Sequence, residues 1–317
     1  MYQMRWLQHG LFLLLLPLIV ASFDLSLASA IGLVLLALLW RWFIALSLVM
    51  FPAKGPELVL HTISASHFVE KVRWCMDRLG VSYTERPSAG TLGAFFAGRT
   101  VPVLRFRTGL VYSSIGNSPE ILRYLWGRYS AETGPAAAFL QPTIERLELE
   151  RRIDRCGVDL QVWVYFLMLP DRGLTLHAWG DHNPDVPLYQ RLLLRPLFPL
   201  LRTLIGRSFR LSEIRYLKAV EQIDRLLGEV ETSLADGRKS LLGGEIINFT
   251  DISFAAISGL WLQPPEYGGG KADTVKIDRV RVPERMRADI ERWTTLFPRA
   301  SAFVQELYRH QRHVSDE

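Results

Sequence analysis

Two serines stand immediately before expected helices, where a hydroxyl group can serve either chemistry or structure. Ser66 precedes a helical pattern over 67–79, and Ser118 precedes Pro119, which suits a first helical position because it has no N–H. The start of a helix favours negative charge. A hydroxyl placed there can stabilise a thiolate, the nucleophilic form of a thiol. Ser66 can equally act as a plain N-cap.

The segments around these serines alternate between strand and helix patterns. Apolar runs with β-branched residues predict strands, and Gly80 predicts the end of the first helix. The order β-α-β-α-β-β-α is that of a thioredoxin-like domain, which we assign to residues 57–129. The strands are expected over 58–63, 81–84, 100–106 and 110–113, and the helices over 67–79, over 91–97 as a short or irregular segment, and from 118 onward.

Long helical patterns follow this domain. Beyond a linker expected at 130–137, the sequence predicts an all-helical domain over 138–312. Asn248 and Asp251 form a variant of the capping box at the start of one helix. His177 and His182 are interpreted as parts of a polar loop, and no metal site is predicted. Apolar residues at three- and four-residue spacing indicate further helices over 143–169, over 188–204 as one helix or a pair, and over 214–234.

Residues 1–53 are apolar and carry few charges. A helix needs roughly 20 apolar residues to cross a bilayer. The stretch over about 25–51 is long enough, and the stretch over about 6–23 is marginal. We therefore expect a membrane anchor in the form of a transmembrane helical hairpin, with Arg41 close to an interface. A signal peptide cleaved after Ala30 is the alternative, although another long apolar run follows that point directly.

Charge and cysteine content restrict the partners and the compartment. The net charge is +5, yet no basic run carries a nucleic-acid motif, so an anionic membrane surface suits this charge better than a nucleic acid. Arg5 and Lys54 flank the expected hairpin and predict that the folded domains face the cytoplasm. The only two cysteines, Cys75 and Cys156, are in neither a disulfide nor a metal-ligand spacing.

Three short runs follow one another along the chain: SHFVEKVRW (66–74), TVPVL (100–104) and NSPEILRYL (117–125). In this order they resemble the N-terminal domain of the glutathione transferase superfamily, in classes that use a serine. The segments 240–260 and 290–307 are similar to helices of that family's C-terminal domain, in which Asp251 would be structural. The resemblance covers about residues 57 to 312 and implies a thioredoxin-like domain followed by an all-α domain.

The resemblance implies a site for reduced glutathione as co-substrate. Ser66 would activate the glutathione thiol, with Ser64 as the fallback. A cis bond between Val101 and Pro102 would turn the Val101 backbone toward the cysteinyl part of the tripeptide. A trans proline at a strand edge is the alternative. Because position 66 is not a cysteine, thiol-transferring variants of the family are not expected.

The two ends of glutathione would be held by other residues of the same domain. Ser118 and Asn117 would bind the γ-glutamyl end, and Arg99 would reach the glycyl carboxylate. Asn117 departs from the acidic residue or glutamine usual in the family and would bind the ammonium group more weakly than a carboxylate does. His67 stands where the family has a proline, so the turn at the site can differ.

These features predict a membrane-anchored enzyme that activates glutathione for attack on a small hydrophobic electrophile. Trp163, Tyr165 and Phe166 are candidates for the wall of the electrophile site. The expected partners are glutathione, the electrophile, the membrane and, in a homodimer, a second copy. The alternative is a non-catalytic, membrane-tethered docking or scaffold protein similar to metaxins. The departures at Asn117 and His67 favour that alternative. The retained Ser66, Pro102 and Ser118 oppose it.

Overall fold

The computed structural model describes residues 27–50, 58–97, 101–108 and 111–312, which fall into two compact units. The first unit contains helix α3 (Leu27–Met50) together with residues 107–108 and 111–112. The second unit contains the rest of the sheet and all the other described helices. The candidate site residues that the structure describes all belong to the second unit.

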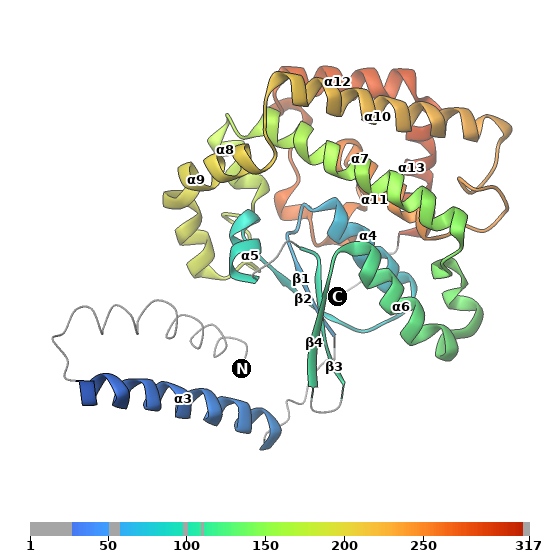
Figure 1. The fold of residues 1–317 in the computed structure, drawn as a ribbon. Helices are drawn as coiled ribbons and strands as arrows, with labels where there is room; N and C mark the ends of the chain where they lie inside the picture. The colour runs from blue at the N-terminus through green and yellow to red at the C-terminus, as the bar shows by residue number, and fades with distance from the viewer. Residues whose placement is uncertain (1–26, 51–57, 98–100, 109–110, 313–317) are drawn as a thin grey trace. The chain divides into compact units, whose positions relative to one another are not determined.

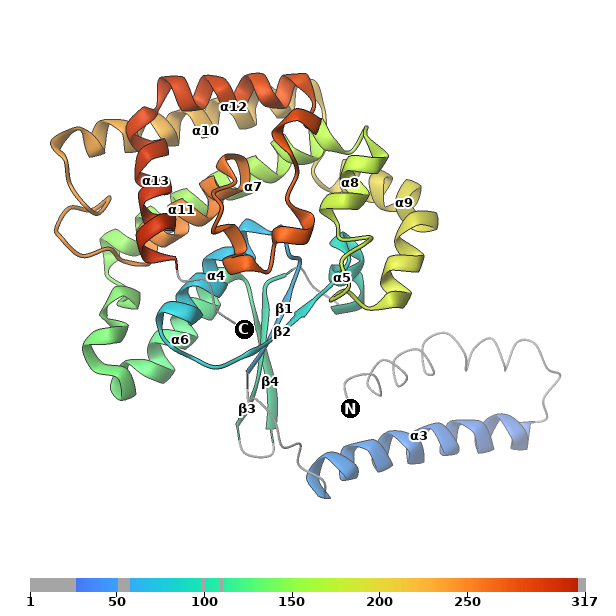
Figure 2. The same ribbon diagram turned by 180° about the vertical axis from the view of Figure 1, so that it is seen from behind.

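The second unit is built on a four-stranded mixed sheet with the order β2-β1-β3-β4. β1 runs parallel to β2, with Val59 opposite Thr84, and antiparallel to β3, with Leu60 opposite Leu104. Helices α4 and α6 lie on one side of the sheet and α5 on the other (Figure 1 and Figure 2). This is the predicted thioredoxin-like arrangement. The elements are β1 (Leu58–Thr62), α4 (His67–Arg78), β2 (Thr84–Pro87), α5 (Gly90–Ala97), β3 (Val103–Thr108), β4 (Val111–Gly116) and α6 (Ser118–Thr133).

Strand β2 begins three residues later than the sequence predicted. Gly80, at φ 69°, ends α4, and the Val81 N–H donates to the Met76 carbonyl at 3.1 Å. Residues 81–83 therefore complete the helix ending, and pairing with β1 starts at Thr84. The apolar residues that suggested a strand at 81–84 help to close the helix.

The boundaries of α6 also differ from the prediction. Asn117, not Ser118, is the N-cap, and Ser118 is the first helical residue. At its other end α6 continues to Thr133, and a 3-10 segment over Gly134–Leu140 follows it. The residues expected to form a linker are thus largely helical. Helix α6 buries Ile121 against the sheet and α4.

The remainder of the second unit is helical, as predicted. Helices α7 and α10 match the expected ranges, and the segment from 188 forms one helix, not a pair. The capping box at the start of α11 is confirmed: Asp251 accepts the N–H groups of Asn248 and Leu241 at 2.7 Å each. The helices are α7 (Ile144–Met168), α8 (Arg172–Ala178), α9 (Leu188–Ser208), α10 (Glu213–Ser233), α11 (Phe249–Leu262), α12 (Glu284–Leu296) and α13 (Pro298–Gln311).

Helix α3 covers much of the second stretch that was expected to cross a membrane. Most of the apolar side chains described in this helix are exposed, among them Leu36, Leu39 and Trp42 at 64–67%. However, none of the helices within the described residues is both long and apolar enough to cross a membrane. The transmembrane hairpin is therefore not confirmed, and its first expected span, residues 6–23, lies outside the described residues.

Candidate functional site

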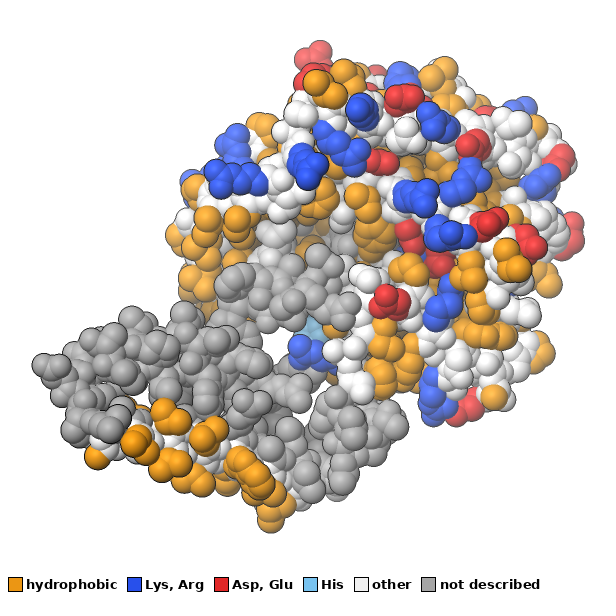
Figure 3. Space-filling model, viewed as in Figure 1, with side chains coloured by type: hydrophobic (Ala, Val, Ile, Leu, Met, Phe, Trp, Pro, Cys, Tyr) orange, Lys and Arg blue, Asp and Glu red, His pale blue; other side chains and the backbone are white. Residues whose placement is uncertain are grey.

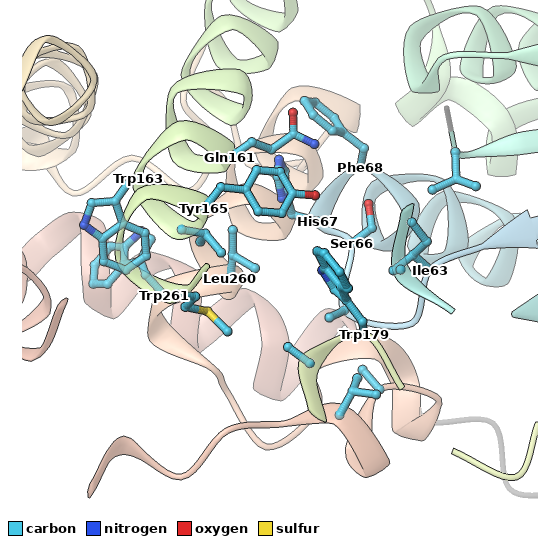
Figure 4. Close-up of a pocket in the computed structure, with 18 of the residues that line it drawn as sticks. Ile63, Ser66, His67, Phe68, Gln161, Trp163, Tyr165, Trp179, Leu260 and Trp261 are labelled. Carbon is cyan, nitrogen blue, oxygen red and sulfur yellow. The ribbon is translucent and has the colours of Figure 1, made fainter. Parts of the chain in front are cut away.

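A cavity of about 580 Å³ opens where the N-terminal ends of α4 and α6 meet helices α7 and α11 (Figure 4). The lining includes five of the residues predicted from the sequence: Ser66, Val101, Pro102, Asn117 and Ser118. These residues come from three separate segments of the chain. The fold therefore brings them together around one space large enough for a small ligand.

Ser66 is partly buried and caps α4 at the edge of the cavity. Its hydroxyl oxygen accepts the Val69 N–H at 3.4 Å, and its carbonyl accepts the Glu70 N–H at 2.9 Å. The capping bond uses the oxygen as an acceptor, so the O–H remains able to donate to a ligand. The structural role and the chemical role of Ser66 are therefore compatible.

His67, which departs from the motif of the family that the sequence resembles, connects α4 to α7 by a hydrogen bond. The ring is buried, and its Nε2–H donates to the Gly157 carbonyl at 3.0 Å. A side chain at Gly157 would meet the Phe68 ring at 2.8 Å and the His67 ring at 3.2 Å, so the Phe68 ring would have to move to accommodate it. Burial lowers the pKa of His67 to about 4, although the bond to Gly157 opposes the shift. The ring is thus neutral at pH 7, and its role is to fix the site's turn.

The bond between Val101 and Pro102 is cis, as the sequence suggested. Both residues line the cavity, and β3 begins immediately after them at Val103. Ser64, the fallback for Ser66, is not among the lining residues. Its buried hydroxyl instead accepts a hydrogen bond from Asn183 Nδ2 at 3.4 Å.

Ser118 and Asn117 bring the start of α6 to the same cavity. Ser118 is buried, and its position in the first turn exposes it to the positive end of the helix dipole. Asn117 has φ 66° and ψ 135°, a conformation that costs a residue with a side chain on the order of 1–3 kcal/mol. Its amide reaches Glu120 Oε1 at 3.5 Å, and Glu120 also lines the cavity. Arg99 lies outside the described residues.

The opposite wall of the cavity is largely aromatic. Trp163 and Tyr165 line it, and Figure 4 shows the Tyr165 hydroxyl pointing into the space in front of Ser66. Burial raises the pKa of Tyr165 to about 12, so its hydroxyl stays protonated at neutral pH. Phe166 was expected in this wall, but its ring stacks on Tyr216 with centroids 4.8 Å apart. Neighbouring residues on α7 point in different directions, which explains this error.

Sequence reasoning missed an ion cluster beside the cavity. Lys71 of α4 is fully buried and lies 2.8 Å from Glu150 and 2.9 Å from Asp154, both on α7. Asp154 lines the cavity. The four-residue spacing of the two acids was the only signal, and in a sequence such a pair more often indicates a solvated helix face.

Solved structures with similar folds include glutathione transferases, whereas no family model and no curated sequence matches the chain. A glutathione S-transferase of Ceriporiopsis subvermispora in complex with glutathione is 16% identical, with a TM-score of 0.48 over 82% of this chain and 99% of that one. One from Methylobacterium radiotolerans, in complex with glutathione sulfonate, is 16% identical, with a TM-score of 0.47 over 82% and 96%. FzlA from C. crescentus is 16% identical, with a TM-score of 0.42 over 79% and 87%. At these identities and TM-scores the likeness establishes neither a family nor a reaction for this chain.

The depressed pKa of His67 predicts a stability that depends on pH. Above pH 6.5 His67 is neutral in both states. As the pH falls from about 6.5 toward about 4, the unfolded chain binds a proton that the folded chain does not. The free energy of unfolding should then fall by up to about 1.4 kcal/mol per pH unit from this group. Urea unfolding at several pH values in this window measures the slope.

His67→Gln is the matched variant for this slope, because glutamine keeps a donor for Gly157 but does not titrate. It should lose less stability than the wild type between pH 6.5 and 4. His61 contributes in the same direction in both proteins, since burial, Arg105 and Arg86 lower its pKa to about 4. Identical slopes for the wild type and His67→Gln would contradict the prediction.

Proposed function

We propose that the cavity binds reduced glutathione and activates its thiol for attack on a hydrophobic electrophile. One observation carries the proposal: Ser66, the Val101–Pro102 segment and Ser118 line a single cavity although they come from separate parts of the chain. Each alone has an ordinary structural explanation. Two helix starts and the Val101–Pro102 segment around one space suit a zwitterionic peptide with a thiol better than an apolar ligand.

The proposed chemistry follows from the electrostatics of the α4 start. The thiol would lie near Ser66, where the helix dipole and a donated hydrogen bond favour the thiolate. The thiol proton passes to solvent, and the sulfur forms a bond to an electrophilic carbon. The electrophile releases a leaving group or takes up a proton. Trp163 and Tyr165 would contact its apolar part.

Glutathione binding to the full chain tests this function. Isothermal titration should give saturable binding, and Ser118→Ala should weaken it by about 10-fold or more, the effect of losing a hydrogen bond to a charged group. Ser301→Ala is a matched control, because Ser301 is also a buried serine in the first turn of a helix but does not line the cavity. Absence of binding by the wild type would favour the non-catalytic docking protein.

We also propose that residues 1–53 attach the protein to a membrane with the second unit facing the cytoplasm. The exposed apolar side chains of α3 support this, because an apolar surface of this kind is normally covered by lipid or protein. Cys75 and Cys156 are both free thiols and agree with a reducing compartment. Flotation of the full chain with lipid vesicles tests attachment, and a chain that stays in the aqueous fraction would rule it out.

A further inference from the structure

Helix α9 carries apolar side chains on the face that is turned away from its own core. Leu194, Phe198 and Ile205 are buried against α5 and α8 and form the inner face. Leu192, Leu200 and Leu204 follow one another at spacings of eight and four residues on the outer face and are 65%, 56% and 50% exposed. A helix that is apolar on both faces is normally covered on both.

The remaining surface of this segment is basic. Between residues 186 and 212 the chain contains five arginines and no acidic residue. Arg195 pairs with Asp181, whereas Arg202 and Arg207 are exposed and form no ion pair within the described part of the chain. Figure 3 shows apolar side chains over α9, with Lys and Arg side chains next to them.

Two prolines within α9 do not disrupt the helix. Pro199 cannot donate to the Arg195 carbonyl, and the Arg172 guanidinium donates to that oxygen instead, at 3.0 Å. The backbone N–H of Ala89, which precedes α5, donates to Gln190 Oε1 at 2.9 Å and fixes the N-terminal end of α9. The outer leucines therefore stand on a fixed helix.

We propose that α9 docks on the surface of an anionic lipid bilayer. The outer leucines would enter the boundary between headgroups and acyl chains, and the arginines would contact lipid phosphates. Charge complementarity favours this occupant over a second copy of the chain. A symmetric contact between two α9 helices would bring together two arginine-rich segments that contain no acidic residue of their own. This docking depends on a different surface from the glutathione cavity.

A fluorescent label on α9 of the full chain tests the proposal. The label reports the contact of α9 itself with lipid, separately from any membrane attachment through residues 1–53. Leu192→Cys is labelled with a polarity-sensitive dye, since Cys75 and Cys156 are buried and free. Leu217→Cys on α10, at 53% exposure, is the matched control. The vesicles contain phosphatidylserine or only phosphatidylcholine, each with a spin-labelled lipid that quenches nearby dyes. We expect quenching at position 192 and not at 217, and only with phosphatidylserine.

Removing charge from α9 should weaken this contact. Arg202→Gln and Arg207→Gln together are expected to reduce the association of α9 with the surface by about fivefold for each arginine, seen as lost quenching. Quenching that is absent at position 192, equal at both positions, or independent of anionic lipid would overturn the proposal. A dye shift without lipid that grows with protein concentration would assign the surface to a second copy instead.

Discussion

Replacing Lys71 by methionine is expected to lower the free energy of unfolding by about 3–5 kcal/mol, the usual cost of removing one partner from a buried ion pair. The Lys71 side chain is fully buried between Glu150 and Asp154. Methionine has a similar length but leaves the two carboxylates without this cation. Glu150 keeps Arg123 at 2.8 Å, whereas Asp154 has no second cation among its ion pairs within the described residues. Urea unfolding measures the loss.

A second substitution separates the ion pair from the packing of the side chain. Lys71→Met with Asp154→Asn should recover part of the stability, because the carboxylate that Lys71→Met leaves without a cation is then replaced by a neutral amide. Lys239→Met is the control: Lys239 pairs with Glu245 on the surface and should contribute little that can be measured. If Lys71→Met unfolds at the same urea concentration as the wild type, or if the double variant recovers nothing, the pair does not hold α4 against α7.

The sequence was most informative where local patterns determine structure. The periodicity of α7 and α10 predicted those helices closely, and Asn248 with Asp251 located the start of α11. Errors occurred where a local pattern has two solutions. The residues after Gly80 could begin a strand or complete the end of the helix. The hydrogen bond from the Val81 N–H to the Met76 carbonyl shows that they complete the helix. Position in a sheet depends on pairing with β1, which no local pattern contains.

The candidate site was also predictable from the sequence only in part. Ser66, Pro102 and Ser118 were predictable because each belongs to a short motif at the end of an element. The contacts that hold the motifs in place join residues far apart in the chain. His67 packs on Gly157, and a single glycine within a helical pattern gives no sign of such a contact. Lys71 has the sequence context of an ordinary surface residue, and only the fold shows that α7 covers it. Such positions need the tertiary structure.

Ser66→Ala is expected to slow the reaction of glutathione with an electrophile at pH 7 by about 10- to 100-fold. A hydrogen bond to a charged group contributes about 1.5–3 kcal/mol, so its loss should raise the pKa of the bound thiol by about one to two units. The ultraviolet absorbance of the bound thiolate, titrated against pH, gives that pKa directly. The variant should approach the wild-type rate as the pH rises above the new pKa, because both proteins then bind the thiolate.

The control must separate this effect from the loss of a helix cap. Ser212 caps α10 by accepting the Arg215 N–H at 3.2 Å, much as Ser66 accepts the Val69 N–H, and it does not line the cavity. Both alanine variants should therefore lose a similar stability, about 1 kcal/mol. Only Ser66→Ala should change the thiol pKa. A capping role alone would leave that pKa in place while stability falls, and a hydrogen bond to the thiolate requires the two quantities to change together in Ser66→Ala.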